Sequence, residues 1–174
     1  MRHRVVRVLP YSPEQLFQLV GDVERYPDFV PWVTSLSVRN PRTEGEGISI
    51  LDAEAGVGFS FVKEKFATRV RRDAKTNDII VTLLWGPFRR LLNHWRFEPS
   101  AGGCQVVFEI DFEFKSRLLD MMLAANFARA VDKLIGCFEA RAQALYPSGG
   151  PPPLEGEELP GSSPLGGSTG RRPG

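Results

Sequence analysis

The sequence has little cysteine, no long apolar run and almost no excess of either charge, and each shortage disfavours a class of protein. Its 174 residues include only Cys104 and Cys137, and neither has a partner at metal-ligand spacing, so a structural zinc site and a disulfide scaffold are poor interpretations. The longest uncharged apolar stretch, residues 79–88, is about half of what a bilayer-spanning helix needs, which excludes a transmembrane protein. A formal net charge of +1 gives no general excess for binding nucleic acid, and DNA is not expected as a partner.

The two ends of the chain predict where the protein works and where its folded part stops. The first residues alternate apolar and basic side chains. They lack the apolar core of a secretory signal and are too few for a transit peptide, so we expect a reduced, cytoplasmic protein. Residues 147–174 contain 19 Pro, Gly or Ser among 28 residues, too little apolar surface to offset the entropy of ordering. We therefore predict one domain over residues 1–146 and a disordered tail over residues 147–174, with a proline-rich ligand segment as the alternative for the tail.

Residues 2–9 alternate as an opening strand, and the start of a helix follows. Ser12 is a good N-cap, Pro13 suits the first helical position and Gln15 completes a capping box. Apolar residues then recur at helical spacing as far as Gly21, and a second short helix must end before Pro27. Beyond this point, from residue 34 to residue 114, the pattern is strands separated by turns at residues 44–47, 55–56, 75–78 and 101–103.

The last strand and the segment after it indicate how the sheet is covered. Phe108, Phe112 and Phe114 alternate with acidic residues, so one face of an antiparallel sheet is apolar and the other is wet. Residues 117–145 carry apolar side chains at steps of three and four, which predicts one long amphipathic helix. Strands joined by hairpins and followed by a helix favour an α+β fold, with a curved sheet of about seven strands wrapped around that helix.

Two groups of segments carry a resemblance to a known family. The first is the aromatic and proline cluster at residues 24–32, Glu-Arg-Tyr-Pro-Asp-Phe-Val-Pro-Trp. The second group comprises residues 86–91, 95–97, 108–114, 116–119 and 125–142. In this order they make the chain similar to the bacterial coenzyme-Q-binding START-like proteins of the polyketide cyclase/dehydrase superfamily. That superfamily also includes the mitochondrial coenzyme Q chaperones and a bacterial ribosome-association toxin, and the resemblance covers nearly all of residues 1–146.

The resemblance implies a helix-grip fold, in which the curved sheet leaves an apolar tunnel beside the C-terminal helix and two short helices close it. It implies a non-enzymatic lipid chaperone that binds ubiquinone (coenzyme Q) and supports respiratory electron transport, with no cofactor besides that ligand. It also implies a bacterial protein, cytoplasmic or peripheral on the cytoplasmic face of the inner membrane. One alternative is a regulator that binds the large ribosomal subunit through the arginine pairs 71–72 and 89–90 and the N-terminal arginines. The least favoured alternative is a polyketide cyclase or dehydratase.

A site for a polyisoprenoid should be lined by bulky, soft side chains with few polar anchors. The candidate ligand-binding residues are Tyr26, Phe29, Pro31, Trp32, Phe59, Phe61, Trp85, Phe88, Leu119, Met122, Leu123 and Phe127. Plain core packing is the alternative for Phe127, while a staple for the short helices or a surface at the membrane interface is the alternative for the residues before Val33. Arg89 and Arg90 stand beside an apolar tip and suit anionic headgroups, which predicts a membrane-surface role for both.

The other polar residues predict neither a catalytic site nor a metal site. His94 has no Ser or Cys nucleophile motif near it in the sequence, so we assign no catalytic residue. Glu109, Asp111 and Glu113 are spaced two apart on one face of a strand, a spacing that allows chelation of a cation. A solvated sheet face with basic neighbours is the favoured interpretation of these three residues.

Overall fold

The computed structural model describes residues 1–59 and 62–147, so Phe61 and most of the predicted tail lie outside the described part of the chain. The elements, in chain order, are β1 (Arg2–Leu9), α1 (Pro13–Gly21), the 3-10 helix η1 (Val23–Arg25), α2 (Tyr26–Phe29), β2 (Val33–Gly45), β3 (Ile48–Phe59), β4 (Val62–Asp73), β5 (Asp78–Trp85), β6 (Phe88–Ser100), β7 (Gly103–Phe114), α3 (Arg117–Ala124) and α4 (Phe127–Leu145). The domain boundary at residue 146 stays a prediction.

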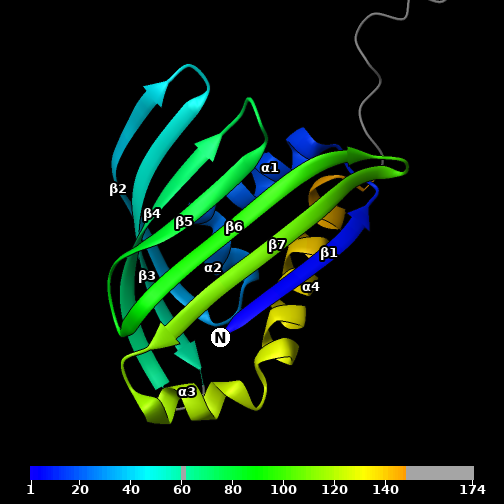
Figure 1. Ribbon diagram of the computed structural model, residues 1–174. Coiled ribbons are helices and arrows are strands. Elements are labelled where there is room, and N and C mark those ends of the chain that lie inside the picture. Colours follow the sequence, from blue (N-terminus) through cyan, green and yellow to red (C-terminus); the bar gives the residue numbers. More distant parts are fainter. Residues whose placement is uncertain (60–61, 148–174) are drawn as a thin grey trace, which may run out of the picture.

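The strands form one antiparallel sheet in the order β1-β7-β6-β5-β4-β3-β2. Consecutive strands from β2 to β7 are neighbours, and β1 completes the sheet by pairing with β7. The sheet is curved, and α1, α2 and α4 lie on its concave side (Figure 1). This architecture confirms the predicted α+β helix-grip fold.

The start of α1 forms as the sequence predicts. The hydroxyl oxygen of Ser12 accepts a hydrogen bond from the Gln15 backbone nitrogen at 3.1 Å, and the Ser12 backbone nitrogen donates to Gln15 Oε1 at 2.9 Å. These reciprocal bonds are the predicted capping box, with Pro13 in the first turn. The helix ends at Gly21, and Leu16 on its inner face is buried. Local sequence signals therefore fix both ends of this helix.

Three of the four predicted turns are confirmed and one is wrong. The connections β2–β3, β4–β5 and β6–β7 fall at residues 46–47, 74–77 and 101–102. Residues 55–56, by contrast, lie inside β3, where Ala55 pairs with Leu36 on one side and Phe66 on the other. An isolated glycine weakens a strand without ending it when both neighbouring strands continue the ladder.

The prediction of a single helix over residues 117–145 is wrong, because the structure divides this segment into α3 and α4. Asn126 leaves helical geometry, with φ −127° and ψ 13°, and asparagine is a residue type that suits helix boundaries. After the break the Phe127 ring packs against Phe112 and His3, with ring centroids 5.0 and 5.6 Å away. Docking of Phe127 on the sheet sets the direction of α4, while α3 turns across the end of the sheet (Figure 1).

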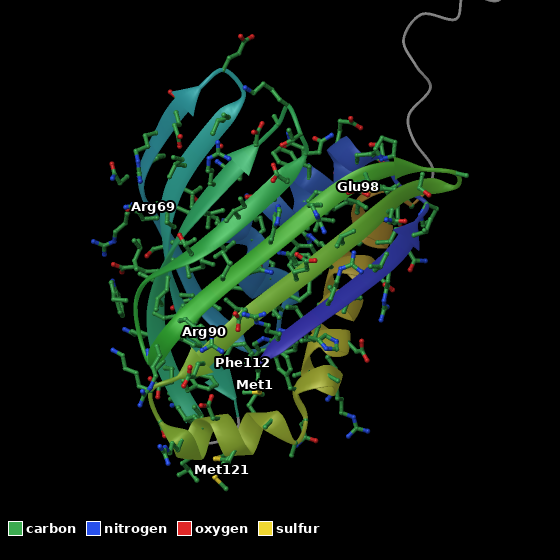
Figure 2. The ribbon with its side chains drawn as sticks, viewed as in Figure 1. Met1, Arg69, Arg90, Glu98, Phe112 and Met121 are labelled. Atoms are coloured by element: carbon green, nitrogen blue, oxygen red, sulfur yellow. The ribbon has the colours of Figure 1, made fainter. Side chains whose placement is uncertain are left out.

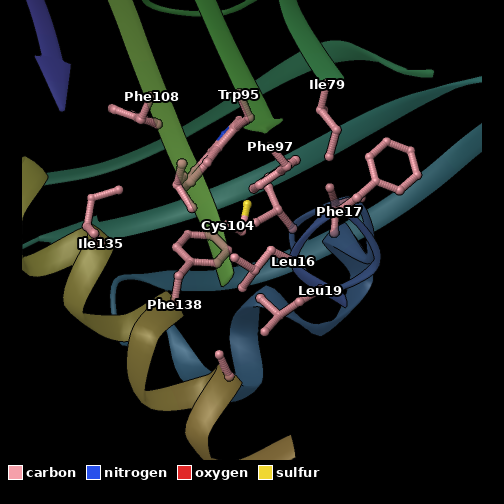
Figure 3. Packing of buried hydrophobic residues seen from close by; sticks show 14 of the residues in the cluster. Leu16, Phe17, Leu19, Ile79, Trp95, Phe97, Cys104, Phe108, Ile135 and Phe138 are labelled. Atoms are coloured by element: carbon pink, nitrogen blue, oxygen red, sulfur yellow. The ribbon is translucent and has the colours of Figure 1, made fainter. Parts of the chain in front are cut away.

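The main core lies on the concave face of the sheet, under α1 and α4 (Figure 3). Trp95 is 4% exposed, and its ring centroid lies 6.1, 4.6 and 5.1 Å from those of Phe97, Phe108 and Phe138. Trp95, Phe108 and Phe138 are therefore core residues. Because Phe138 comes from α4 and the other rings come from β6 and β7, this aromatic group joins the helix to the sheet.

Both cysteines are free thiols. Cys104 is fully buried, and burial raises the pKa of its thiol to about 11. Burial also raises the pKa of Cys137. Because the thiolate is the reactive form, both groups are suited to packing and poorly suited to redox or nucleophilic chemistry near neutral pH.

Candidate functional site

Side chains fill the space where the sheet faces α4. The cavity enclosed by β1, β6, β7, α1 and α4 has a volume of about 20 Å³, which holds one water molecule at most. Its walls include Leu16, Trp95, Phe108, Ile135 and Phe138. The apolar tunnel expected beside the C-terminal helix is therefore not formed by these residues, because their rings and branched side chains interdigitate as in an ordinary protein interior. A bulky ligand needs another part of the concave face.

Five phenylalanines form a connected group at the end of the sheet nearest α3, and we call this group the aromatic end cluster. Phe88 stacks on Phe114 with 4.8 Å between ring centroids and meets Phe66 edge-on at 5.3 Å. Phe112 links Phe88 to Phe127, at 6.2 and 5.0 Å. Phe112 is buried, whereas the other four are half-buried. Because these large apolar rings stay partly accessible, this end of the sheet is a candidate site for an apolar ligand.

The turn between β5 and β6 brings Phe88 into the aromatic end cluster. Gly86 has a φ of 146°, and a Cβ at this position would lie 2.4 Å from Phe66 Cβ. Only glycine therefore lets the turn approach β4 this closely. The Lys115 backbone nitrogen donates to the Pro87 carbonyl at 2.7 Å, which joins the turn to the segment that leads into α3.

Helix α3 lies across the end of the sheet beside the aromatic end cluster (Figures 1 and 2). The hydroxyl oxygen of Ser116 accepts from the Leu119 backbone nitrogen at 3.3 Å, and Asp120 Oδ1 accepts from the Phe114 backbone nitrogen at 3.0 Å. Leu119 and Leu123 are half-buried, and no residue of α3 is fully buried. A helix with so little buried surface separates from its sheet at a small free-energy cost.

Of the five rings in the aromatic end cluster, only Phe88 and Phe127 are among the ligand-binding residues predicted from the sequence. The two phenylalanines of β7 lie on the face that the alternation in that strand predicts to be apolar. Phe66 was missed, although it shares one face of β4 with Thr68 and Val70, both buried. The alternation of these residues with basic ones was a usable signal, but the proximity of Phe66 to Phe88 depends on strand register and turn geometry.

Tyr26 and Phe29 lie on α2 and pack against α4. Their ring centroids are 5.2 and 5.3 Å from that of Phe138, and the Arg141 guanidinium lies 5.3 Å from the Phe29 ring centroid. The Tyr26 hydroxyl donates to the Val20 carbonyl, and burial raises the pKa of Tyr26 above its ordinary value. Both rings thus pack against the core cluster, as a staple between the short helices and α4 would.

The remaining candidate residues are spread over several connections. Pro31 is exposed and Trp32 half-buried between α2 and β2, and Trp85 is 48% exposed at the end of β5. Phe59 is the last residue of β3, and Phe61 lies outside the described residues. A ligand-binding role for these five residues stays a prediction.

The convex face of the sheet carries paired charges. The acidic residues of β7 face arginines of β1 and β6, namely Arg4 and Arg96 at Glu109, Arg2 and Arg90 at Asp111, and Arg90 at Glu113. The hydrogen bond from Arg90 lowers the pKa of Asp111. The predicted solvated sheet face with basic neighbours is confirmed. Within residues 1–59 and 62–147, no group of three or more side chains that could hold a metal ion occurs.

The two arginines predicted to meet a membrane differ in their surroundings. The Arg90 guanidinium donates to Asp111 Oδ1 at 3.0 Å and to Glu113, and these carboxylates raise its pKa. Arg89 is exposed. The charge of Arg90 is thus balanced within the sheet, and the membrane-surface role of both residues stays a prediction. His94 is also paired on this face, with its Nε2 3.0 Å from Asp78 Oδ2.

A second hollow lies at the opposite end of the sheet from α3. It has a volume of about 520 Å³ and is bounded by α1, the β2–β3 turn, β4 and the end of α4. Arg72 lines it and donates to Ser49 Oγ at 3.0 Å and to the Gly21 carbonyl at 2.9 Å. Asp22 also lines it. Charged walls suit an isoprenoid chain poorly, so the aromatic end cluster with α3 is the better candidate site.

Comparison with known proteins identifies the family. The family described as polyketide cyclase / dehydrase and lipid transport matches residues 9–139. The chain belongs to this family. The fold is shared by an aromatase/cyclase from Streptomyces (18% identical, TM-score 0.67, covering 86% of this chain and 97% of that one). It is also shared by a START superfamily protein from Mycobacterium smegmatis (20% identical, TM-score 0.68, covering 83% and 97%). At that level of identity these neighbours bear on the fold alone.

Closer relatives of this polyketide cyclase / dehydrase family member carry two kinds of name. The ribosome association toxin RatA of Escherichia coli is 31% identical over 80% of this chain and 85% of its own length. The mitochondrial coenzyme Q-binding protein COQ10 homolog B of Xenopus laevis is 30% identical over 80% of this chain and 57% of its own length. An 18 kDa protein of Caulobacter crescentus with a solution structure is 60% identical, with a TM-score of 0.72 over 84% of this chain and 99% of that one.

Within residues 1–59 and 62–147, no helix is long and apolar enough to cross a membrane.

Proposed function

We propose that this protein is a non-enzymatic ubiquinone carrier, which binds the quinone between α3 and the aromatic end cluster and supports respiratory electron transport. The observation that carries the proposal is the pairing of four half-buried phenylalanines with a helix that has no fully buried residue. The relative named as a coenzyme Q-binding protein supports the choice of ligand. The same proposal places the protein in a bacterial cytoplasm, with access to the inner membrane.

Binding in this place requires α3 to move outward. The space at α4 is packed, whereas α3 has no fully buried residue and is joined to the end of β7 by the hydrogen bond from the Phe114 backbone nitrogen to Asp120 Oδ1. A guest between Leu119, Leu123 and the phenylalanine rings would contact hydrocarbon on both sides. Burial of roughly 300 Å² of apolar ligand surface contributes about 7 kcal/mol. Ordering and association costs then reduce the net free energy, so we expect an affinity that is micromolar at best.

The side chains of the aromatic end cluster also support a carrier over a cyclase. Cyclisation and dehydration of a polyketide need an acid or base beside the substrate. The five rings of the cluster are hydrocarbon and offer neither.

A titration with a short-chain, water-soluble ubiquinone tests the proposal through quenching of tryptophan fluorescence, with Trp85 next to the β5–β6 turn as the nearby reporter. Leu119→Asp is expected to weaken binding at least tenfold, because a carboxylate in an apolar site costs roughly 2 kcal/mol or more. Leu118→Asp is the matched control, because Leu118 is the neighbouring residue of the same helix and is 66% exposed. Its affinity should stay close to that of the unmodified protein.

Two results would contradict the carrier proposal. One is an unmodified protein whose fluorescence does not respond to quinone and which brings no quinone with it when purified from bacterial membranes and extracted with organic solvent. The other is an equal loss in both aspartate variants, after thermal melting has shown that both are folded.

Ribosome association is the second candidate function, and the name of the Escherichia coli relative favours it. Contact with ribosomal RNA depends on basic side chains that are available to phosphates and weakens steeply with salt. Several of the arginines considered for this role are already engaged in the structure: Arg2, Arg4, Arg71 and Arg90 face carboxylates, and Arg72 donates to Ser49 and Gly21.

Sedimentation with purified large ribosomal subunits separates the two functions. The carrier proposal predicts that the protein stays in the supernatant at low and at high salt. Co-sedimentation at low salt that disappears at high salt would favour the ribosomal role.

A further inference from the structure

The outer side of α3 exposes a group of apolar side chains at the tip of the molecule. Leu118, Met121 and Met122 are 66, 72 and 39% exposed. Figure 2 shows Met121 pointing away from the sheet, at the end of the protein that α3 forms. Because Leu119 and Leu123 on the inner side are half-buried, α3 presents an apolar surface both to the aromatic end cluster and to its surroundings.

Basic residues lie at the same end of the molecule as this exposed face. Lys115 and Arg117 lead into α3, Arg89 follows the β5–β6 turn, and Lys63 and Lys65 begin β4. All five are exposed, and none belongs to an ion pair within the described ranges. The arginines that flank β7 are different, because they face carboxylates.

The acidic residues near α3 are either engaged or partly covered. Asp120 accepts the hydrogen bond from the Phe114 backbone nitrogen, and Glu113 is bound by Arg90. Glu64 of β4 is half-buried. The α3 end of the protein therefore combines exposed apolar side chains with an excess of unpaired positive charge.

We propose that this end docks onto the surface of an anionic lipid bilayer, with α3 lying in the interface. A short amphipathic segment inserts its apolar side chains at the level of the headgroups, while surrounding lysines and arginines are attracted to anionic lipids. Both parts are present here at the α3 end of the molecule. A protein partner would need a complementary acidic and apolar surface, whereas an anionic bilayer supplies negative charge and an apolar layer over the whole area at once.

Flotation of the full chain with lipid vesicles tests this docking, and no quinone is needed, so the result is independent of the carrier proposal. Binding is expected with vesicles of phosphatidylcholine and phosphatidylglycerol, but only weakly with phosphatidylcholine alone. It should fall as salt is added, because the attraction is partly between exposed charges.

Two double variants separate the apolar and the electrostatic contributions. Leu118→Ser with Met121→Ser is expected to weaken binding to the anionic vesicles at least about tenfold. Each basic residue near an anionic surface contributes about fivefold, so Lys115→Glu with Arg117→Glu is expected to weaken binding by about 25-fold or more. All four positions are exposed, so the variants should melt like the unmodified protein.

Matched controls change the same residue types elsewhere on the surface. Val6→Ser with Val8→Ser alters two exposed apolar residues of β1, which are 43 and 53% exposed. Lys75→Glu with Lys133→Glu reverses two exposed charges away from α3. Both controls should bind vesicles nearly as well as the unmodified protein. A charge reversed far from the docking surface weakens the attraction to the vesicle only slightly in salt. Docking through α3 is refuted if the unmodified protein does not float with anionic vesicles, or if the α3 variants bind as well as these controls.

Discussion

Replacing Gly103 with alanine is expected to lower the free energy of unfolding by about 3–5 kcal/mol, through backbone strain and overpacking together. Gly103 begins β7 with a φ of 135°, a conformation that L side chains rarely adopt. A Cβ at this position would lie 2.3 Å from the Leu9 carbonyl oxygen and 2.9 Å from the Tyr11 backbone nitrogen. These are backbone atoms, so the end of β1 and the start of β7 would have to separate. Urea unfolding followed by circular dichroism measures the loss.

Gly102→Ala is the matched control for this prediction. Gly102 also has a positive φ, 92°, but nothing lies within 4 Å of the Cβ it lacks. Its replacement should cost only the conformational strain, about 1–2 kcal/mol. Equal losses in the two variants would show that the close approach of β1 to β7 is not what requires glycine at residue 103.

Truncation of Trp95 to alanine is expected to cost about 3–5 kcal/mol of stability, as for other large core side chains. Trp95 is 4% exposed and packs between rings from β6, β7 and α4. Its indole nitrogen also donates to Asn93 Oδ1 at 2.9 Å. Its removal would therefore leave a cavity, lose aromatic contacts and free a half-buried amide oxygen. The same urea experiment measures the effect.

Leu92→Ala provides the control on the same strand. Leu92 is 49% exposed, and the loss there should stay within about 0.5–1 kcal/mol. A small loss in Trp95→Ala would mean that the interior at α4 is loosely packed. Trp95→Ala should also leave quinone affinity almost unchanged in the folded fraction, because the proposed site lies at the aromatic end cluster. If Trp95→Ala lost as much quinone affinity as Leu119→Asp, the quinone would have to bind near α4 and not at the aromatic end cluster.

Local signals in the sequence were enough for most of the fold. The capping box at Ser12 and the alternation from Phe108 to Phe114 each depend on residues close together in the chain, and both structures form as predicted. The break at Asn126 was not predictable in this way. No glycine or proline marks it, and its direction depends on Phe127 meeting Phe112 and His3, which come from distant strands.

The candidate site was predictable in part. The sequence predicts Phe88, Leu119 and Leu123 as ligand-binding residues, and they lie at the α3 end of the sheet. It does not predict Phe66, because the nearness of Phe66 to Phe88 arises from the strand pairing and from the tight approach at Gly86. It also predicts Tyr26 and Phe29, but their contacts are with α4. The sequence identifies which residues are apolar, whereas the fold determines which of them line the same site.

The order of the strands has a consequence for self-association. An open sheet leaves β1 and β2 at its margins, where free backbone groups invite pairing with another copy and growth into aggregates. The free margin of β1 carries the exposed arginines Arg2 and Arg4 in alternation with inward residues. The pairing of β2 shifts register in three places, and Asn40 within it has a φ of 51°. The irregular backbone of β2 opposes strand addition at its margin, so fibril growth from that side of the sheet is disfavoured at high concentration.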